Sequence, residues 1–189
     1  MTQTLHLPYP PEGSTREQIL LHYLQNPGKP DWFLCTDGAG YTDMYAGAAA
    51  YGVSIRHNKK FHRLAGFNGA STDRAEFLGL LHGLHGIFET MCWDNSSRLK
   101  ALEHRRAEIV WISDRESLVR SVTGEYRRRT QPDLWAQFEW YEQYIDIRPC
   151  HVKRNSVPWQ DVADILASES RVLIKEYDQL VQDSELFKV

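Results

Sequence analysis

The chain has 189 residues, of which 42% are hydrophobic, and its formal net charge is −3 at pH 7. This length suits one globular domain with a sizeable core, and the charge argues against a strongly basic nucleic-acid-binding protein. Three scattered cysteines exclude a disulfide framework, and no apolar stretch reaches the roughly 20 residues of a membrane span. We therefore expect a soluble, cytoplasmic protein with reduced cysteines.

Residues 1–31 are expected to form an extension of the domain. Three prolines precede a short predicted helix, and Ser14 with Glu17 forms a capping box ahead of its apolar residues. We expect this helix to pack on the domain. The domain itself is predicted over residues 32–182, with a tail at 183–189.

The first half of the predicted domain is rich in strands. Extended segments are expected at about 32–37, 45–56 and 60–67, and a Gly-Ala-Gly sequence is expected to turn the chain after the first of them. An amphipathic helix follows at about 73–91, with apolar residues at i, i+3, i+4 and i+7. Its three glycines lower its intrinsic helix propensity, so we expect close packing on the sheet to offset them.

The second half alternates strands with helices. In chain order we expect an irregular insertion at 92–106, a strand at 108–114, a helix at 115–123, a helix from Pro132, a strand at 144–152 and a helix from Pro158 to about 180. Strands that come first and then alternate with helices predict a mixed sheet flanked by helices.

Four carboxylates have sequence contexts that would bring them to one point. Asp37 and Asp114 each end a predicted buried strand. Glu76 opens the first long helix, and Asp164 lies near the start of the last one. Clustered ionised carboxylates repel one another unless a cation offsets their charge, and hard divalent cations such as Mg²⁺ take oxygen ligands. The pattern therefore predicts a metal site.

Five motifs in this order resemble the type 1 ribonuclease H family of the ribonuclease H-like superfamily. They are Thr36-Asp37-Gly38-Ala39-Gly40, Ser71-Thr72-Asp73-Arg74-Ala75-Glu76, Ile112-Ser113-Asp114, Asp133-Leu134-Trp135 and Ala163-Asp164-Ile165-Leu166-Ala167. The resemblance spans residues 32 to 170. It implies the α/β ribonuclease H-like fold, in which a five-stranded mixed sheet, three antiparallel strands followed by parallel ones, has helices on both faces.

The resemblance also implies an activity. It is that of a metal-dependent endonuclease that hydrolyses the RNA strand of an RNA–DNA hybrid with two Mg²⁺ or Mn²⁺ ions. The family's catalytic, metal-binding acids fall on Asp37, Glu76, Asp114 and Asp164. In a two-metal mechanism, one ion lowers the pKa of the attacking water and the other stabilises the leaving 3′ oxygen.

Two places are predicted to bind the nucleic acid. Thr72 would donate its hydroxyl to a phosphate near a helix start, or would only cap that helix. The run Arg127, Arg128 and Arg129 lies where the family carries a basic handle for the DNA strand. As a charge run alone it would be a solvated loop, and the resemblance favours the phosphate-binding role.

Two residues are secondary candidates at the catalytic centre. His151 belongs to the end of a predicted strand, where a histidine satisfied by one hydrogen bond is the favoured interpretation and a supporting catalytic role the other. Asp161 precedes Asp164 by one helical turn and competes with it as a ligand. The Ala-Asp-Ile-Leu-Ala context assigns the metal to Asp164.

The predicted substrate contacts depart from the family. Asp43, Asp73 and Glu116 stand where the family often has amides that touch the hybrid. Acids repel phosphates, although they accept hydrogen bonds from a ribose 2′-OH. Two alternatives therefore stay open: a nuclease of the same fold that acts on DNA or structured RNA, and a non-catalytic module that binds nucleic acid or protein. The four acids argue against the second.

Overall fold

The computed structural model describes most of the predicted domain. The described residues are 30–40, 43–54, 58–92, 106–154 and 157–183. The predicted N-terminal helix, most of the predicted insertion and the predicted tail therefore lie outside the described residues, and these predictions stay untested.

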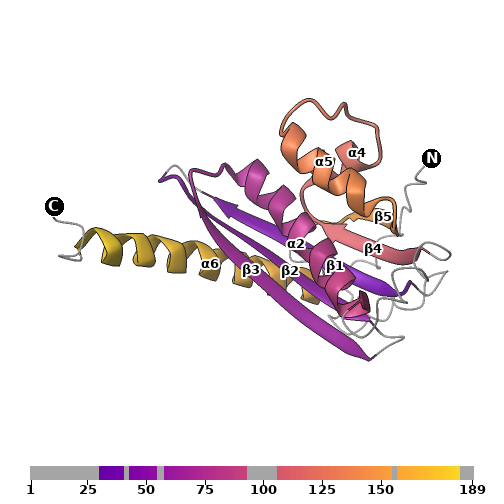
Figure 1. Cartoon of the computed structure of the whole chain (residues 1–189), viewed down its shortest axis with the longest axis horizontal. Helices are drawn as coiled ribbons and strands as arrows, with labels where there is room; N and C mark the ends of the chain where they lie inside the picture. Colours follow the sequence, from indigo (N-terminus) through magenta and orange to yellow (C-terminus); the bar gives the residue numbers. More distant parts are fainter. Residues whose placement is uncertain (1–29, 41–42, 55–57, 93–105, 155–156, 184–189) are drawn as a thin grey trace.

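A five-stranded mixed sheet forms the centre of the fold, with strand order β3-β2-β1-β4-β5 (Figure 1). The strands are β1 Trp32–Gly40, β2 Tyr45–Ser54, β3 Lys59–Asn68, β4 Ala107–Ser113 and β5 Ile145–His151. The β1–β2 and β2–β3 pairs are antiparallel, whereas β1–β4 and β4–β5 are parallel. The predicted sheet is confirmed.

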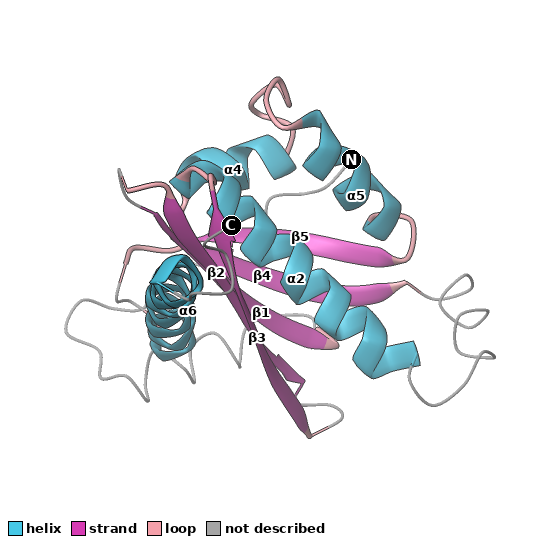
Figure 2. Ribbon diagram, turned by 60° about the vertical axis from the view of Figure 1, so that its left-hand side comes forward, coloured by secondary structure: helices cyan, strands magenta, loops and turns pink. Residues whose placement is uncertain are grey.

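Helices cover both faces of this sheet (Figure 2). They are α2 Thr72–Cys92, α4 Glu116–Val122 and α5 Pro132–Tyr141 on one face, and α6 Pro158–Asp183 on the other. Side chains along β1 point alternately to the two faces of the sheet. Trp32 and Leu34 therefore join the core under α2, and Phe33 and Cys35 join the core under α6. No helix among the described residues is long and apolar enough to cross a membrane.

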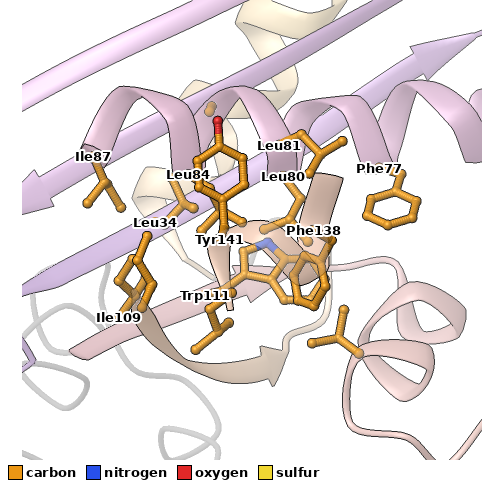
Figure 3. Packing of buried hydrophobic residues seen from close by; sticks show 14 of the residues in the cluster. Leu34, Phe77, Leu80, Leu81, Leu84, Ile87, Ile109, Trp111, Phe138 and Tyr141 are labelled. Carbon is orange, nitrogen blue, oxygen red and sulfur yellow. The ribbon is translucent and has the colours of Figure 1, made fainter. Parts of the chain in front are cut away.

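The core between α2 and the sheet is built as the apolar spacing predicts. Phe77, Leu80, Leu84 and Ile87 are buried along one face of α2, where they pack with residues of β1, β4 and α5 (Figure 3). Burying each such side chain contributes roughly 1.5–3 kcal/mol. The glycines of α2 permit this close approach, since a Cβ on Gly79 would lie 2.8 Å from the Asp37 carbonyl oxygen.

One predicted boundary is wrong. The Gly38-Ala39-Gly40 segment does not turn the chain but continues β1, where Gly38 pairs with Ala48 of β2. The physical reason is that Gly38 lies against the first turn of α2. A Cβ on Gly38 would be 2.2 Å from the backbone nitrogen of Glu76. The glycine thus serves close packing of a strand on a helix rather than a turn.

Candidate active site

Three of the predicted acids meet at the C-terminal end of the β1–β4 ladder, in the middle of the sheet. Ligand oxygens of Asp37, Glu76 and Asp114 all lie within 4.8 Å of one another. Because Cys35 pairs with Ile112 in the parallel β1–β4 ladder, the residues two positions further along each chain emerge at the same end of the ladder. Glu76 reaches them from the first turns of α2, which lie against β1.

The fourth acid comes from the opposite layer. Asp164 of α6 lines the same cavity of about 340 Å³ as the other three acids, together with Thr72 and Arg154. The charge of Asp164 also acts on Asp37, whose pKa it helps to raise. The start of α6 is held on β1 by the buried Gln160, whose Nε2 donates to the carbonyl oxygen of Thr36 at 2.9 Å. The structure therefore brings all four predicted acids together.

The acids of this cluster repel one another at neutral pH. Burial, and then the charges of Asp114 and Asp164, raise the pKa of Asp37 to about 7. Burial and the neighbouring Asp37 likewise raise the pKa of Glu76 well above its ordinary value. Arg154 and Arg115 lower the pKa values of Asp37 and Glu76, respectively, but not enough to offset burial and the neighbouring acids. A bound cation would supply the remaining positive charge.

The donor set fits a hard divalent cation. All donors are carboxylate oxygens, which Mg²⁺ and Mn²⁺ prefer. The Oε2 atom of Glu76 is buried and has no hydrogen-bond partner among the described residues. A buried carboxylate oxygen without a donor is costly, and coordination of a cation would satisfy it.

Two arginines at the cluster were not predicted as site residues. Arg154 donates from Nη2 to Oδ1 of Asp164 at 2.5 Å, and both side chains line the cavity. Arg115 follows Asp114 directly, but its guanidinium pairs with Asp73. No spacing rule connects either arginine with its partner, because each pair joins separate elements. For Arg115, its position beside a predicted ligand was an available signal.

The structure separates the two competing acids of α6. Asp164 lines the cavity of the acid cluster, whereas Asp161 is not among the residues that line it. This placement agrees with the assignment of the metal to Asp164. His151 lies at the end of β5, and its Nε2 is 3.2 Å from the backbone carbonyl oxygen of Asp114. That contact is the single strand-end hydrogen bond that the sequence favoured, and a supporting catalytic role stays a prediction.

Of the two roles predicted for Thr72, the structure gives the helix cap of α2 to its neighbour Ser71. Ser71 Oγ accepts a hydrogen bond from the backbone N–H of Arg74 at 3.2 Å, so Ser71 rather than Thr72 caps the helix. Thr72 instead lines the cavity that holds the four acids. Its predicted contact with a phosphate therefore stays open.

The three consecutive arginines line a second cavity of about 210 Å³. Arg115 lines both cavities and so lies between them. Within the run, Arg127 and Arg129 are exposed. Arg128 differs, because its guanidinium stacks over Trp135 at 4.4 Å from the ring centroid.

Arg128 is also held by two acids, one in α5 and one at its C-cap. Its Nη1 lies 3.5 Å from Glu139 and 3.4 Å from Glu142, and 26% of its side chain is exposed. These contacts give Arg128 a packing role. The sequence predicted only a phosphate-binding role for it. Arg127 and Arg129 keep the geometry expected of a basic handle.

Each acid that departs from the family's substrate contacts has a cationic partner within the chain. Asp43 accepts hydrogen bonds from Arg171 at 2.6 Å and from Lys175 at 3.1 Å. Asp73 pairs with Arg115, and Glu116 pairs with Arg120 at 2.5 Å one helical turn away. The repulsion of phosphates that these acids would cause is therefore partly offset.

No protein-family model matches the chain, and no curated protein sequence matches it. Solved structures do. The N-terminal RNase H domain of Rv2228c from Mycobacterium tuberculosis is 17% identical, with a TM-score of 0.59 over 79% of this chain and 99% of that one. LC11-RNase H1 in complex with an RNA/DNA hybrid is 16% identical, with a TM-score of 0.60 over 76% of this chain and 98% of that one. RNase H1 of Halobacterium salinarum NRC-1 is 19% identical, with a TM-score of 0.52 over 74% of this chain and 96% of that one.

The chain therefore has the ribonuclease H-like fold, as the five sequence motifs predicted. Within that fold, the solved structures that it resembles include several type 1 ribonucleases H. At identities of 16–19%, this likeness establishes the fold.

Proposed function

We propose that this protein is a divalent-cation-dependent endonuclease that hydrolyses the RNA strand of RNA–DNA hybrids. The observation that carries the proposal is the meeting of Asp37, Glu76 and Asp114 within 4.8 Å at the C-terminal end of the β1–β4 ladder. Asp164 completes the cluster from α6. An independent support is that a structure with the same fold, LC11-RNase H1, is a complex with an RNA/DNA hybrid.

The four acids would hold two Mg²⁺ or Mn²⁺ ions, which supply a water of lowered pKa and charge stabilisation of the leaving oxygen. Asp37 lies close to Glu76 and Asp114, and the charges of Asp114 and Asp164 both raise its pKa. Its carboxylate therefore lies between the acids contributed by β4 and α2 and the acid contributed by α6. Glu76 brings a buried oxygen that lacks a donor among the described residues. The fixed strand ends and the capped helix hold these groups in place before any ligand arrives.

The neighbouring cavity would hold the rest of the nucleic acid. Arg127 and Arg129 are exposed at this cavity and are free to meet phosphates of the strand that is not cut. Thr72, at the start of α2, lies beside the acids and would contact a phosphate of the strand that is cut. Both roles are part of the proposal.

A labelled RNA–DNA hybrid tests the proposal directly. Cleavage of the RNA strand should require Mg²⁺ or Mn²⁺, and should be lost in Asp37→Asn and Asp114→Asn while the circular dichroism spectrum is unchanged. Asp161→Asn is the matched control on α6 and should retain more activity than Asp164→Asn. Cation-dependent cleavage that survives in Asp37→Asn would overturn the assignment.

One observation supports a second candidate substrate, a double-stranded DNA or RNA in place of the hybrid. Asp73 stands beside the acid cluster and is tied to Arg115, so the surface next to Thr72 carries an ion pair where the family often has an amide. An acid there accepts hydrogen bonds but donates none, which alters the contacts with bases and ribose. Parallel assays with double-stranded DNA and double-stranded RNA decide whether the enzyme prefers one of these over the hybrid.

A further inference from the structure

We propose that Arg154 is the resident counter-ion of the acid cluster in the metal-free protein, and that a divalent cation displaces it from Asp164 when it binds. The inference rests on the metal site of the proposed function and adds a residue that neither the motifs nor the fold assigns. It concerns the state of the site before catalysis.

The geometry places one guanidinium on one ligand of the cluster. Arg154 Nη2 is 2.5 Å from Oδ1 of Asp164, which is a charge-assisted hydrogen bond. Both residues line the cavity that also contains Asp37, Glu76 and Asp114. One carboxylate oxygen of a predicted metal ligand is thus engaged by a cationic side chain.

Other cations near the cluster are committed elsewhere. Arg115 lines the same cavity, but its guanidinium pairs with Asp73 rather than with an acid of the cluster. The ion pair of Arg154 joins it to Asp164, which lines the cavity of the acid cluster. Four carboxylates in one cavity need a compensating charge. The charge of Arg115 also acts on Glu76, but Arg154 is the cation in direct contact with one of the four acids.

The contact is also weak enough to be exchanged. The side chain of Arg154 is 66% exposed and that of Asp164 is 30% exposed. Ion pairs with this exposure contribute little, because water screens them and a long side chain must be ordered. A divalent ion that several carboxylates coordinate together outcompetes a single guanidinium that contacts one carboxylate.

Metal titration of the full chain tests this inference without any nucleic acid. After removal of metals, Mn²⁺ binding is measured by calorimetry in wild type, Arg154→Ala, Arg154→Lys and Lys153→Ala. Lys153 is the matched control, since it is the exposed neighbour that carries the same charge. We expect Arg154→Ala to bind Mn²⁺ about two- to fivefold more tightly than Lys153→Ala does, with Arg154→Lys in between.

Thermal melting supplies the second readout. In the presence of a chelator and low salt, Arg154→Ala should melt about 1–3 °C below Lys153→Ala, because its acids have lost their partner. Saturating Mn²⁺ should close this gap. Equal Mn²⁺ affinities in Arg154→Ala and Lys153→Ala, or weaker binding in Arg154→Ala, would overturn the inference.

The outcome is separable from that of the proposed function. If wild type binds Mn²⁺ and the Arg154→Ala variant binds it more tightly, but no hybrid is cut, the substrate proposal fails and the counter-ion role stands. If the hybrid is cut and the two alanine variants bind Mn²⁺ equally, the nuclease stands and the counter-ion role fails.

Discussion

At the scale of one residue, the position of Asp37 changes the pKa of an ordinary carboxyl group. Asp37 is buried at the C-terminal end of the β1–β4 ladder beside Asp114 and Asp164, and its pKa is about 7 instead of 3.8. The folded protein therefore holds a proton on Asp37 that the unfolded chain has already released at the same pH. Stability of the metal-free protein must then fall as pH rises from about 4 to about 7.

This loss of stability is testable with Asp37→Asn. At about pH 8 and without metal, the variant should be more stable than wild type by about 1–3 kcal/mol, because an amide carries no charge into the cluster. At about pH 4 the difference should vanish, since wild-type Asp37 is then protonated as well. Urea denaturation at both pH values measures the free energy of unfolding. The explanation fails if wild type and variant differ equally at the two values.

Arg128 illustrates the opposite case, a charged residue whose role is packing. Its stacking on Trp135 and its contacts with Glu139 and Glu142 hold the loop before α5 against the helix. We expect Arg128→Ala to lower the free energy of unfolding by about 1–3 kcal/mol. The exposed neighbour gives the control, and Arg127→Ala should change stability by less than about 0.5 kcal/mol. Thermal or urea denaturation compares the two, and equal effects would contradict the assigned packing role.

At the scale of elements, the contact between β1 and α2 sets the distance between two acids. Gly38 faces the first turn of α2, so the strand and the helix approach closely between Asp37 and Glu76. A side chain at this position would separate the elements. The site therefore depends on a residue that takes no part in its chemistry.

Gly38→Ala should show this dependence. Its Cβ would fall 2.2 Å from the Glu76 backbone nitrogen, so we expect a loss of roughly 1–3 kcal/mol and a marked loss of Mn²⁺ affinity. Gly124→Ala is the control, because Gly124 has φ +83° and open space around it. That variant should lose about 1–2 kcal/mol through backbone strain alone and keep its metal affinity. Calorimetry with Mn²⁺ separates the two effects, and unchanged affinity in Gly38→Ala would disprove the role of this contact.

At the scale of the whole molecule, a net charge of −3 coexists with a basic cavity. The acids of the metal-free cluster account for part of the negative charge, and cation binding would reduce it. Arginines gather instead between α4 and α5, at the second cavity. The proposed cation site and the proposed phosphate-binding surface are thus separate cavities, and Arg115 lines both.

The salt dependence of hybrid binding tests this division. Replacing Arg127 and Arg129 together by alanine should lower the slope of log K against log salt by about 1–2, since each phosphate contact contributes about 0.9. Binding is measured in the Asp37→Asn background with Mn²⁺ present, so that cleavage does not interfere. Arg120→Ala is the comparison, because Arg120 is engaged by Glu116 and Tyr126. An unchanged slope in the double variant would remove Arg127 and Arg129 from the interface.

Much of the fold was accessible from the sequence because the apolar pattern reports the local environment of each element. The spacing on α2 and the buried runs of β1 and β4 predicted the mixed sheet, since side chains that face one core must recur at the period of their element. The same reasoning predicted Asp37 and Asp114 at strand ends. Asp114 does follow β4, whereas Asp37 lies within β1, two residues beyond its last pair with β4, and the parallel ladder brings the two acids together.

The sequence by itself thus determined the order of the elements and the four acids, because both depend on short-range patterns. Only the tertiary structure decided which polar groups meet across elements: Arg154 with Asp164, Arg128 with Trp135, and Gly38 with the backbone of Glu76. Such contacts depend on how layers pack and on where a loop directs a long side chain. No periodicity in the sequence encodes these distances, which is why a glycine predicted to form a turn became the contact that shapes the site.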